Sequence, residues 1–140
     1  MNVLLVDDQK AIVDSLKNGI RWENLPVEQV YTACSAKEAK LVLMNFAVDV
    51  LISDIEMPEE DGISLCQWAK EKFHSLECIF LTSHADFEYA KKAIQMNSFD
   101  YILQPVRYEE VERALRNVWE KIRQSKKILQ IMDTQKVVLE

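Results

Sequence analysis

Short runs of apolar residues alternate along this chain with longer stretches in which apolar residues recur every three or four positions. The short runs predict buried strands at residues 3–6, 27–32, 48–53, 78–81 and 99–103. The longer stretches predict helices, with apolar positions at Ile12, Val13, Leu16 and Ile20; Ala39, Leu43 and Met44; Ile63, Leu65, Cys66, Ala69 and Phe73; and Phe87, Ala90 and Ile94. A capping box, Ser35-Ala36-Lys37-Glu38, begins the second helix, and a last helix begins near Tyr108. This alternation predicts an α/β fold, a doubly wound five-stranded parallel sheet with helices on both faces.

The composition narrows the classes of protein that fit this pattern. The chain has 140 residues, of which 49% are hydrophobic, and this is enough for the core of one domain. Its net charge of −6 argues against nucleic-acid binding by this segment itself. The three cysteines, Cys34, Cys66 and Cys78, lack the spacing of a metal site and are interpreted as reduced thiols. With no leader and no long apolar stretch, we expect a soluble cytoplasmic protein that does not enter a membrane.

Polar side chains stand where four of the predicted strands end. Two carboxylates follow the first strand, one follows the third, and single polar residues follow the fourth and fifth; these residues are Asp7, Asp8, Asp54, Thr82 and Gln104. In an open parallel sheet, ligands bind beyond the carboxyl ends of the strands. Each of these residues alone could be a helix cap or a strand terminus. As a set on one edge of the sheet they predict a binding site.

Three clustered carboxylates need a cation, because like charges raise one another's pKa. A set of oxygen ligands without histidine or cysteine suits a hard ion, and Mg²⁺ is usually held by carboxylates together with water and phosphate oxygens. No phosphate-binding P-loop motif is present, and no glycine-rich dinucleotide motif follows the first strand. Neither His74 nor His84 has a partner that indicates nucleophilic catalysis. We therefore predict Mg²⁺ as the cofactor and no enzyme acting on an external substrate.

Four stretches of the sequence together resemble the receiver domain of two-component response regulators. They are DD at 7–8, VDVLISDIEMPEEDG at 48–62, FLTSHADFEYAKKAI at 80–94 and FDYILQPV at 99–106. The resemblance covers about residues 1–124 and implies a flavodoxin-like sheet with strand order 2-1-3-4-5. The last two stretches are particularly similar to receivers joined to AraC-type DNA-binding domains.

The resemblance implies a role for individual residues. Asp54 would be the phosphoacceptor, and Mg²⁺ would be held by Asp7, Asp8, Asp54 and the backbone carbonyl of Glu56. The phosphoryl group would contact Thr82, Ser83 and Gln104. Thr82 and Tyr101 would form the switch that responds to phosphorylation. The loops around the site would contain Met57, Pro58, Gly62 and Pro105. Pro105 matches the proline that follows a cis peptide bond in the family.

One position departs from the family pattern. The residue before Pro105 is normally lysine, whereas here it is Gln104, which keeps a hydrogen-bond donor but lacks the positive charge. A hydrogen bond to a charged group contributes about 1.5–3 kcal/mol, so phosphorylation is expected to be slower or weaker. Two interpretations stay open. The first is a phosphorylation-operated switch in a phosphorelay, and the second is a pseudo-receiver that serves as an interaction or dimerisation module.

The C-terminal part extends beyond what a receiver needs. Apolar residues recur there in steps of three and four, at Leu115, Val118, Ile122, Leu129 and Met132, with Ser125 between them. We expect residues 125–140 to be a helical linker or extension that continues the last helix. The expected partners are a sensor histidine kinase and a second copy of the chain. The second copy would bind through the fourth helix, fifth strand and last helix, through the extension, or through both. We expect the chain to be the front part of a longer transcription regulator, with its DNA-binding domain outside this sequence.

Overall fold

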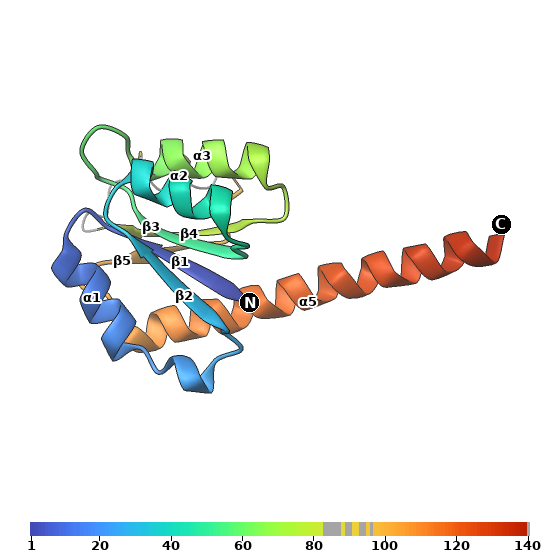
Figure 1. The fold of residues 1–140 in the computed structure, drawn as a ribbon. Coiled ribbons are helices and arrows are strands. Elements are labelled where there is room, and N and C mark those ends of the chain that lie inside the picture. Colours follow the sequence, from blue (N-terminus) through green and yellow to red (C-terminus); the bar gives the residue numbers. More distant parts are fainter. Residues whose placement is uncertain (83–87, 89–90, 93–94, 96, 140) are drawn as a thin grey trace.

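Five parallel strands form a single sheet in the computed structural model, which describes residues 1–82, 88, 91, 92, 95 and 97–139 (Figure 1). The order across the sheet is β2-β1-β3-β4-β5, as predicted. The strands are β1 (Asn2–Val6), β2 (Gln29–Ala33), β3 (Val50–Asp54), β4 (Glu77–Thr82) and β5 (Asp100–Leu103). The second and third strands begin two residues later than predicted, because residues 27 and 28 and residues 48 and 49 precede the paired part of the ladder.

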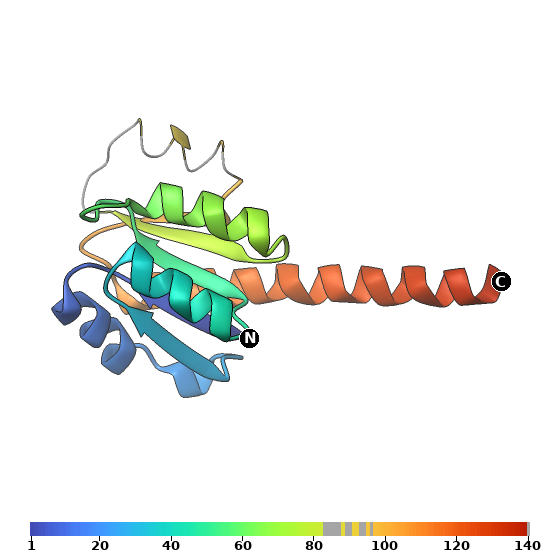
Figure 2. The same cartoon turned by 45° about the horizontal axis from the view of Figure 1, so that its top comes forward.

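Helices cover both faces of this sheet (Figures 1 and 2). One face carries α2 (Ala36–Asn45) and α3 (Gly62–Lys72), and the other carries α1 (Lys10–Gly19) and the first half of α5 (Tyr108–Leu139). A short 3₁₀ helix, Trp22–Asn24, follows α1. Alternate residues of each strand point into the two cores: Leu4 packs with α2 and α3, whereas Val3 and Leu5 pack with α1 and α5. The predicted helical positions Phe87, Ala90 and Ile94 lie outside the described residues.

Side-chain caps set the beginning of two helices. The Ser35 hydroxyl accepts a hydrogen bond from the Glu38 backbone N–H at 3.1 Å, which confirms the predicted cap of α2. The Glu38 carboxylate turns back to accept from the backbone N–H of Cys34 at 2.8 Å. Asp61 caps α3 by accepting from the Ser64 N–H at 2.8 Å. One residue of the predicted α2 pattern, Met44, is 59% exposed and does not belong to the core.

Helix α5 is longer than the sheet that it covers. Its first half is held to the body by the buried residues Val111, Leu115, Val118 and Ile122. The buried Glu112 carboxylate pairs with Arg21 at 3.3 Å and thereby joins α5 to the segment after α1. The second half extends away from the body (Figure 2). Among the helices in the described part of the chain, none is long and apolar enough to cross a membrane.

Candidate functional site

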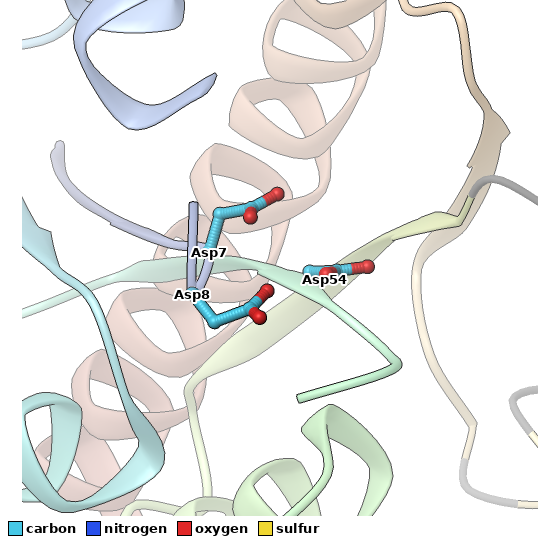
Figure 3. A group of neighbouring side chains, drawn as sticks. All are labelled: Asp7, Asp8 and Asp54. Carbon is cyan, nitrogen blue, oxygen red and sulfur yellow. The ribbon is translucent and has the colours of Figure 1, made fainter. Parts of the chain in front are cut away.

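Three aspartates from two neighbouring strands meet at the carboxyl edge of the sheet. Asp7 and Asp8 directly follow β1, and Asp54 is the last residue of β3. Val6 of β1 is paired with Ser53 of β3, so the residues that follow each of them lie side by side. One carboxylate oxygen from each aspartate lies within 4.8 Å of the other two, and the three side chains point to the same region (Figure 3). The structure thus brings together the three carboxylates that the sequence analysis grouped.

The Asp7 carboxylate is the most deeply buried of the three, with 1% of the residue exposed. Its Oδ1 accepts a hydrogen bond from the Gln9 backbone N–H at 2.9 Å. Its Oδ2 is buried and has no hydrogen-bond partner among the described residues. An unpaired buried carboxylate oxygen is costly, because it has lost water without gaining a donor. A cation bound at this point would satisfy that oxygen.

The local electrostatics favour the same conclusion. Burial raises the pKa of Asp7 to about 6. The hydrogen bond from the Gln9 N–H opposes this increase, and the negative charge of Asp8 adds to it. Burial, and then the charges of Asp7 and Asp8, raise the pKa of Asp54 to about 7. These carboxylates therefore repel one another when ionised. Two or three carboxylate oxygens within 4.8 Å of one another fit the way proteins hold Mg²⁺, which keeps several water ligands.

The other predicted residues take different places around the aspartates. Thr82 is buried at the end of β4, next to β3. The Gln104 backbone N–H donates to the Thr82 carbonyl at 2.6 Å, so the two positions are adjacent. The peptide bond between Gln104 and Pro105 is cis, as predicted. Tyr101 is half-buried on β5 and packs against the core on the α2 and α3 face. Ser83 lies outside the described residues.

The loop after Asp54 packs closely against the strand that carries it. The Gly62 N–H donates to the Ile55 carbonyl at 2.8 Å, and a Cβ at position 62 would overlap the Asp54 carbonyl oxygen. Within the same loop Met57 is buried, whereas Glu56 and Pro58 are exposed. Gly62 therefore allows the first turn of α3 to approach the backbone of Asp54.

Two supporting contacts were not expected from the sequence. The buried Ser53 hydroxyl donates to the Asp54 carbonyl at 2.8 Å. Lys40 on α2 pairs with Glu60 at 2.7 Å and so ties the loop after Asp54 to α2. A lone serine inside an apolar strand run could have indicated the first contact, because a buried hydroxyl needs a partner. No signal in the sequence indicates the second.

Gln104 also borders a hollow of about 380 Å³ between α1 and the segment that joins β5 to α5. The rest of its lining is mainly apolar and includes Ile12, Leu16 and Pro105. The Ser15 and Tyr108 hydroxyls are hydrogen bonded at 2.6 Å across this junction. Gln104 thus contacts the end of β4 through its backbone and borders a hollow beside α1.

Comparison with known proteins assigns the class. The response regulator receiver domain family matches residues 3–116, and the chain belongs to this family. The chain is therefore a receiver domain of two-component response regulators.

Its relatives are response regulators of about twice its length. The chain is 36% identical over 115 residues to an uncharacterized response regulatory protein of Staphylococcus epidermidis. It is 34% identical over 115 residues to the transcriptional regulatory protein HptR of Staphylococcus aureus. In both cases the match covers 81% of this chain and 44% of the relative, so the chain spans less than half the length of these proteins.

Solved receiver structures superpose on most of the chain. A two component transcriptional regulator AraC from Clostridium phytofermentans is 28% identical with a TM-score of 0.84, covering 90% of this chain and 98% of that one. The REC domain of AraT, a response regulator from Geobacillus stearothermophilus, is 32% identical with a TM-score of 0.80, covering 89% and 97%. These similarities agree with the predicted family and with the resemblance to receivers of AraC-type regulators.

Proposed function

We propose that this receiver accepts a phosphoryl group on Asp54 from a sensor histidine kinase and passes the change to an output that regulates transcription. The acidic cluster carries the proposal: Asp54 lies with Asp7 and Asp8 around a point that a divalent cation fits. The names of the relatives, which include a transcriptional regulatory protein and a two component transcriptional regulator, support the kind of output. The chain acts as a phosphoacceptor, and any catalysis is limited to its own phosphorylation and dephosphorylation.

In this proposal an Asp54 carboxylate oxygen attacks the phosphorus atom, and the bond between phosphorus and the nitrogen of the kinase histidine breaks. Asp54 must be ionised to attack, which its pKa of about 7 allows for a large fraction of molecules near neutral pH. Asp7, Asp8 and the Glu56 carbonyl would hold Mg²⁺ beside it. Bound Mg²⁺ offsets the negative charge of the incoming phosphoryl oxygens. Gly62 and Ser53 fix the backbone of Asp54 and so orient its carboxylate for attack.

The proposed signal leaves the site through Thr82 and Tyr101. Thr82 is at the end of β4, where its hydroxyl could bind a phosphoryl oxygen on Asp54 of the adjacent strand, and Ser83 would assist. A phosphoryl group brings about −1.5 to −2 charges and three strong acceptors, enough to bias a local two-state element. Movement of Thr82 would let the half-buried Tyr101 turn inward and change the surface formed by β5 and α5. We propose residues 1–124 as the receiver unit and 125–140 as its helical extension.

Gln104 supports a second candidate, a pseudo-receiver that binds partners without being phosphorylated. Without the usual lysine, the phosphoryl oxygens lose one cationic partner. Both Mg²⁺ carboxylates, the acceptor and Thr82 are nevertheless present, which favours the phosphorylated receiver.

The two candidates differ in one experiment. The chain is incubated with Mg²⁺ and a small phosphodonor, and its intact mass is measured beside Asp54→Asn and, as a matched control, Asp14→Asn, which removes an exposed carboxylate of α1. The switch predicts one added phosphoryl group in the native chain and in Asp14→Asn, and none in Asp54→Asn. An unchanged mass at saturating donor and Mg²⁺ would reject the switch and leave the pseudo-receiver.

A further inference from the structure

We propose that the extension of α5 binds the extension of a second copy of this chain in an antiparallel arrangement. The pairing is independent of phosphorylation and involves none of the residues around Asp54. Ile122 is the last buried residue among the described side chains of this helix, and the second half of the helix extends away from the body (Figures 1 and 2). The distance from residue 122 to residue 139 is about 25 Å at 1.5 Å per residue. Most of the stability of helices in proteins comes from packing of an apolar face, so an uncovered extension would gain stability from a partner.

Helix α5 carries an apolar stripe that is buried against the body in the first half of the helix and exposed in the extension. Leu115 and Val118 are fully buried and Ile122 is 8% exposed, whereas Leu129 and Met132 are 60% and 58% exposed. Successive residues of this set are three, four or seven positions apart, with Ser125 inside the longest step, so they share one helix face. The flanking residues Ile128 and Ile131 are also about half exposed and widen the stripe. The face that holds α5 to the sheet therefore continues as an open apolar surface.

The charges beside this stripe favour one orientation of the partner. Lys126 lies four residues after Ile122, and Asp133 lies four residues after Leu129, so both flank the stripe on the same side. When two extensions run antiparallel with Leu129 beside Met132 of the partner subunit, Lys126 lies close to Asp133 of the partner subunit. Twofold symmetry repeats this attraction. In-register parallel pairing would instead place Lys126 beside Lys121 of the partner subunit, which is already paired with Glu77 at 3.0 Å, so the attraction between Lys126 and Asp133 would be lost.

The body leaves room for such a partner. A notch of about 280 Å³ lies where the extension departs from the lower edge of the sheet. Its lining comes from α5 and from the body next to β3 and β4: Ile122, Ser125, Lys126 and Leu129 on the helix, and Asp49, His74, Ser75 and Glu77 on the body. An antiparallel partner helix that covers Leu129 would bring its final turns to this notch.

The test is sedimentation equilibrium of the 140-residue chain with charge-reversal variants at low salt. We expect a dimer whose Kd increases about ten-fold in Lys126→Asp and in Asp133→Lys, because each change replaces two attractions with two repulsions. The double variant restores the attraction with reversed signs and should return the Kd to near its original value. Lys127→Asp, which changes the next lysine on the outer face of the helix, is the matched control and should leave the Kd unchanged. A monomer at every concentration, or no recovery in the double variant, would overturn the proposal.

Disulfide trapping reports the orientation directly. In a Cys34→Ser background, where the remaining Cys66 and Cys78 are fully buried, a mixture of Leu129→Cys and Met132→Cys chains should crosslink. Ser125→Cys alone should not crosslink, because in this antiparallel register the two copies of position 125 are offset by about 16 Å along the helix axis. Efficient crosslinking of Ser125→Cys alone would establish parallel pairing and overturn the antiparallel arrangement. Circular dichroism of each variant confirms that the fold is retained.

Discussion

Proton binding and Mg²⁺ binding should compete at the acidic cluster. The pKa of Asp7 is raised to about 6 and that of Asp54 to about 7, mainly by burial and the neighbouring carboxylates. Mg²⁺ requires both groups to be ionised, and the two raised pKa values mean that the folded protein holds protons at a pH where free aspartate has lost them.

The size of the effect follows from these two pKa values. Near pH 8 both carboxylates are ionised in about 90% of molecules, whereas near pH 6 both are ionised in about 5%. The apparent Kd for Mg²⁺ should therefore be about 20-fold weaker near pH 6 than near pH 8. Proton release on binding should increase as the pH falls from 8 to 6, because most molecules carry a proton on Asp54 at pH 6.

Isothermal titration calorimetry at several pH values, in buffers with different ionisation enthalpies, measures both the Kd and the number of protons released. Asp54→Asn removes the group with the higher pKa and should bind Mg²⁺ more weakly than the native chain. Its Kd should change by no more than about two-fold between pH 6 and pH 8. A Kd for the native chain that stays constant within two-fold between pH 6 and 8 would refute the reasoning, because the two carboxylates would then not hold protons in that range.

Three further predictions concern the loop, the departure from the family and the metal-free fold. Gly62→Ala should lower the free energy of unfolding in urea by about 1–3 kcal/mol, because its methyl group overlaps the Asp54 carbonyl oxygen; an unchanged midpoint would contradict this close approach. Gln104→Lys should raise the phosphorylation rate about ten-fold to a hundred-fold in a single-turnover assay, and an unchanged rate would show that the charge is not needed here. The pKa values of Asp7 and Asp54 are raised on folding, so the contribution of these two groups to the stability of the metal-free protein should be fully present below their unfolded pKa of about 4 and be lost as the pH rises through about 7. Thermal melts should show a smaller decline for Asp54→Asn, and an equal decline would be evidence against this linkage.

Much of the fold follows from sequence pattern because strands and helices have different apolar periods. Runs such as 3–6 and 78–81 are buried on both faces of the sheet, so they contain almost no polar residue. The convergence of Asp7, Asp8 and Asp54 was also predictable, since parallel strands end at a common edge. Helix and strand ends were less certain, because pairing with a neighbour decides where a ladder begins.

The rest depends on contacts between distant parts of the chain. Ser15 and Tyr108 are 93 residues apart, and Arg21 and Glu112 are 91 residues apart, yet each pair is hydrogen bonded. No local period predicts such contacts. The raised pKa of Asp54 likewise arises from burial and from the two carboxylates that follow β1. The size of neither effect can be calculated from the sequence alone.

Every role proposed for the acidic cluster depends on transfer of the phosphoryl group to Asp54. Peptide-level mass spectrometry of the chain after reaction with a phosphodonor and Mg²⁺ tests this transfer, with borohydride reduction to trap the acyl phosphate at its position. We expect a single reduced aspartate, at Asp54, in the native chain and its loss when Mg²⁺ is chelated before the reaction. Label at another carboxylate, or no label at saturating donor and Mg²⁺, would contradict it.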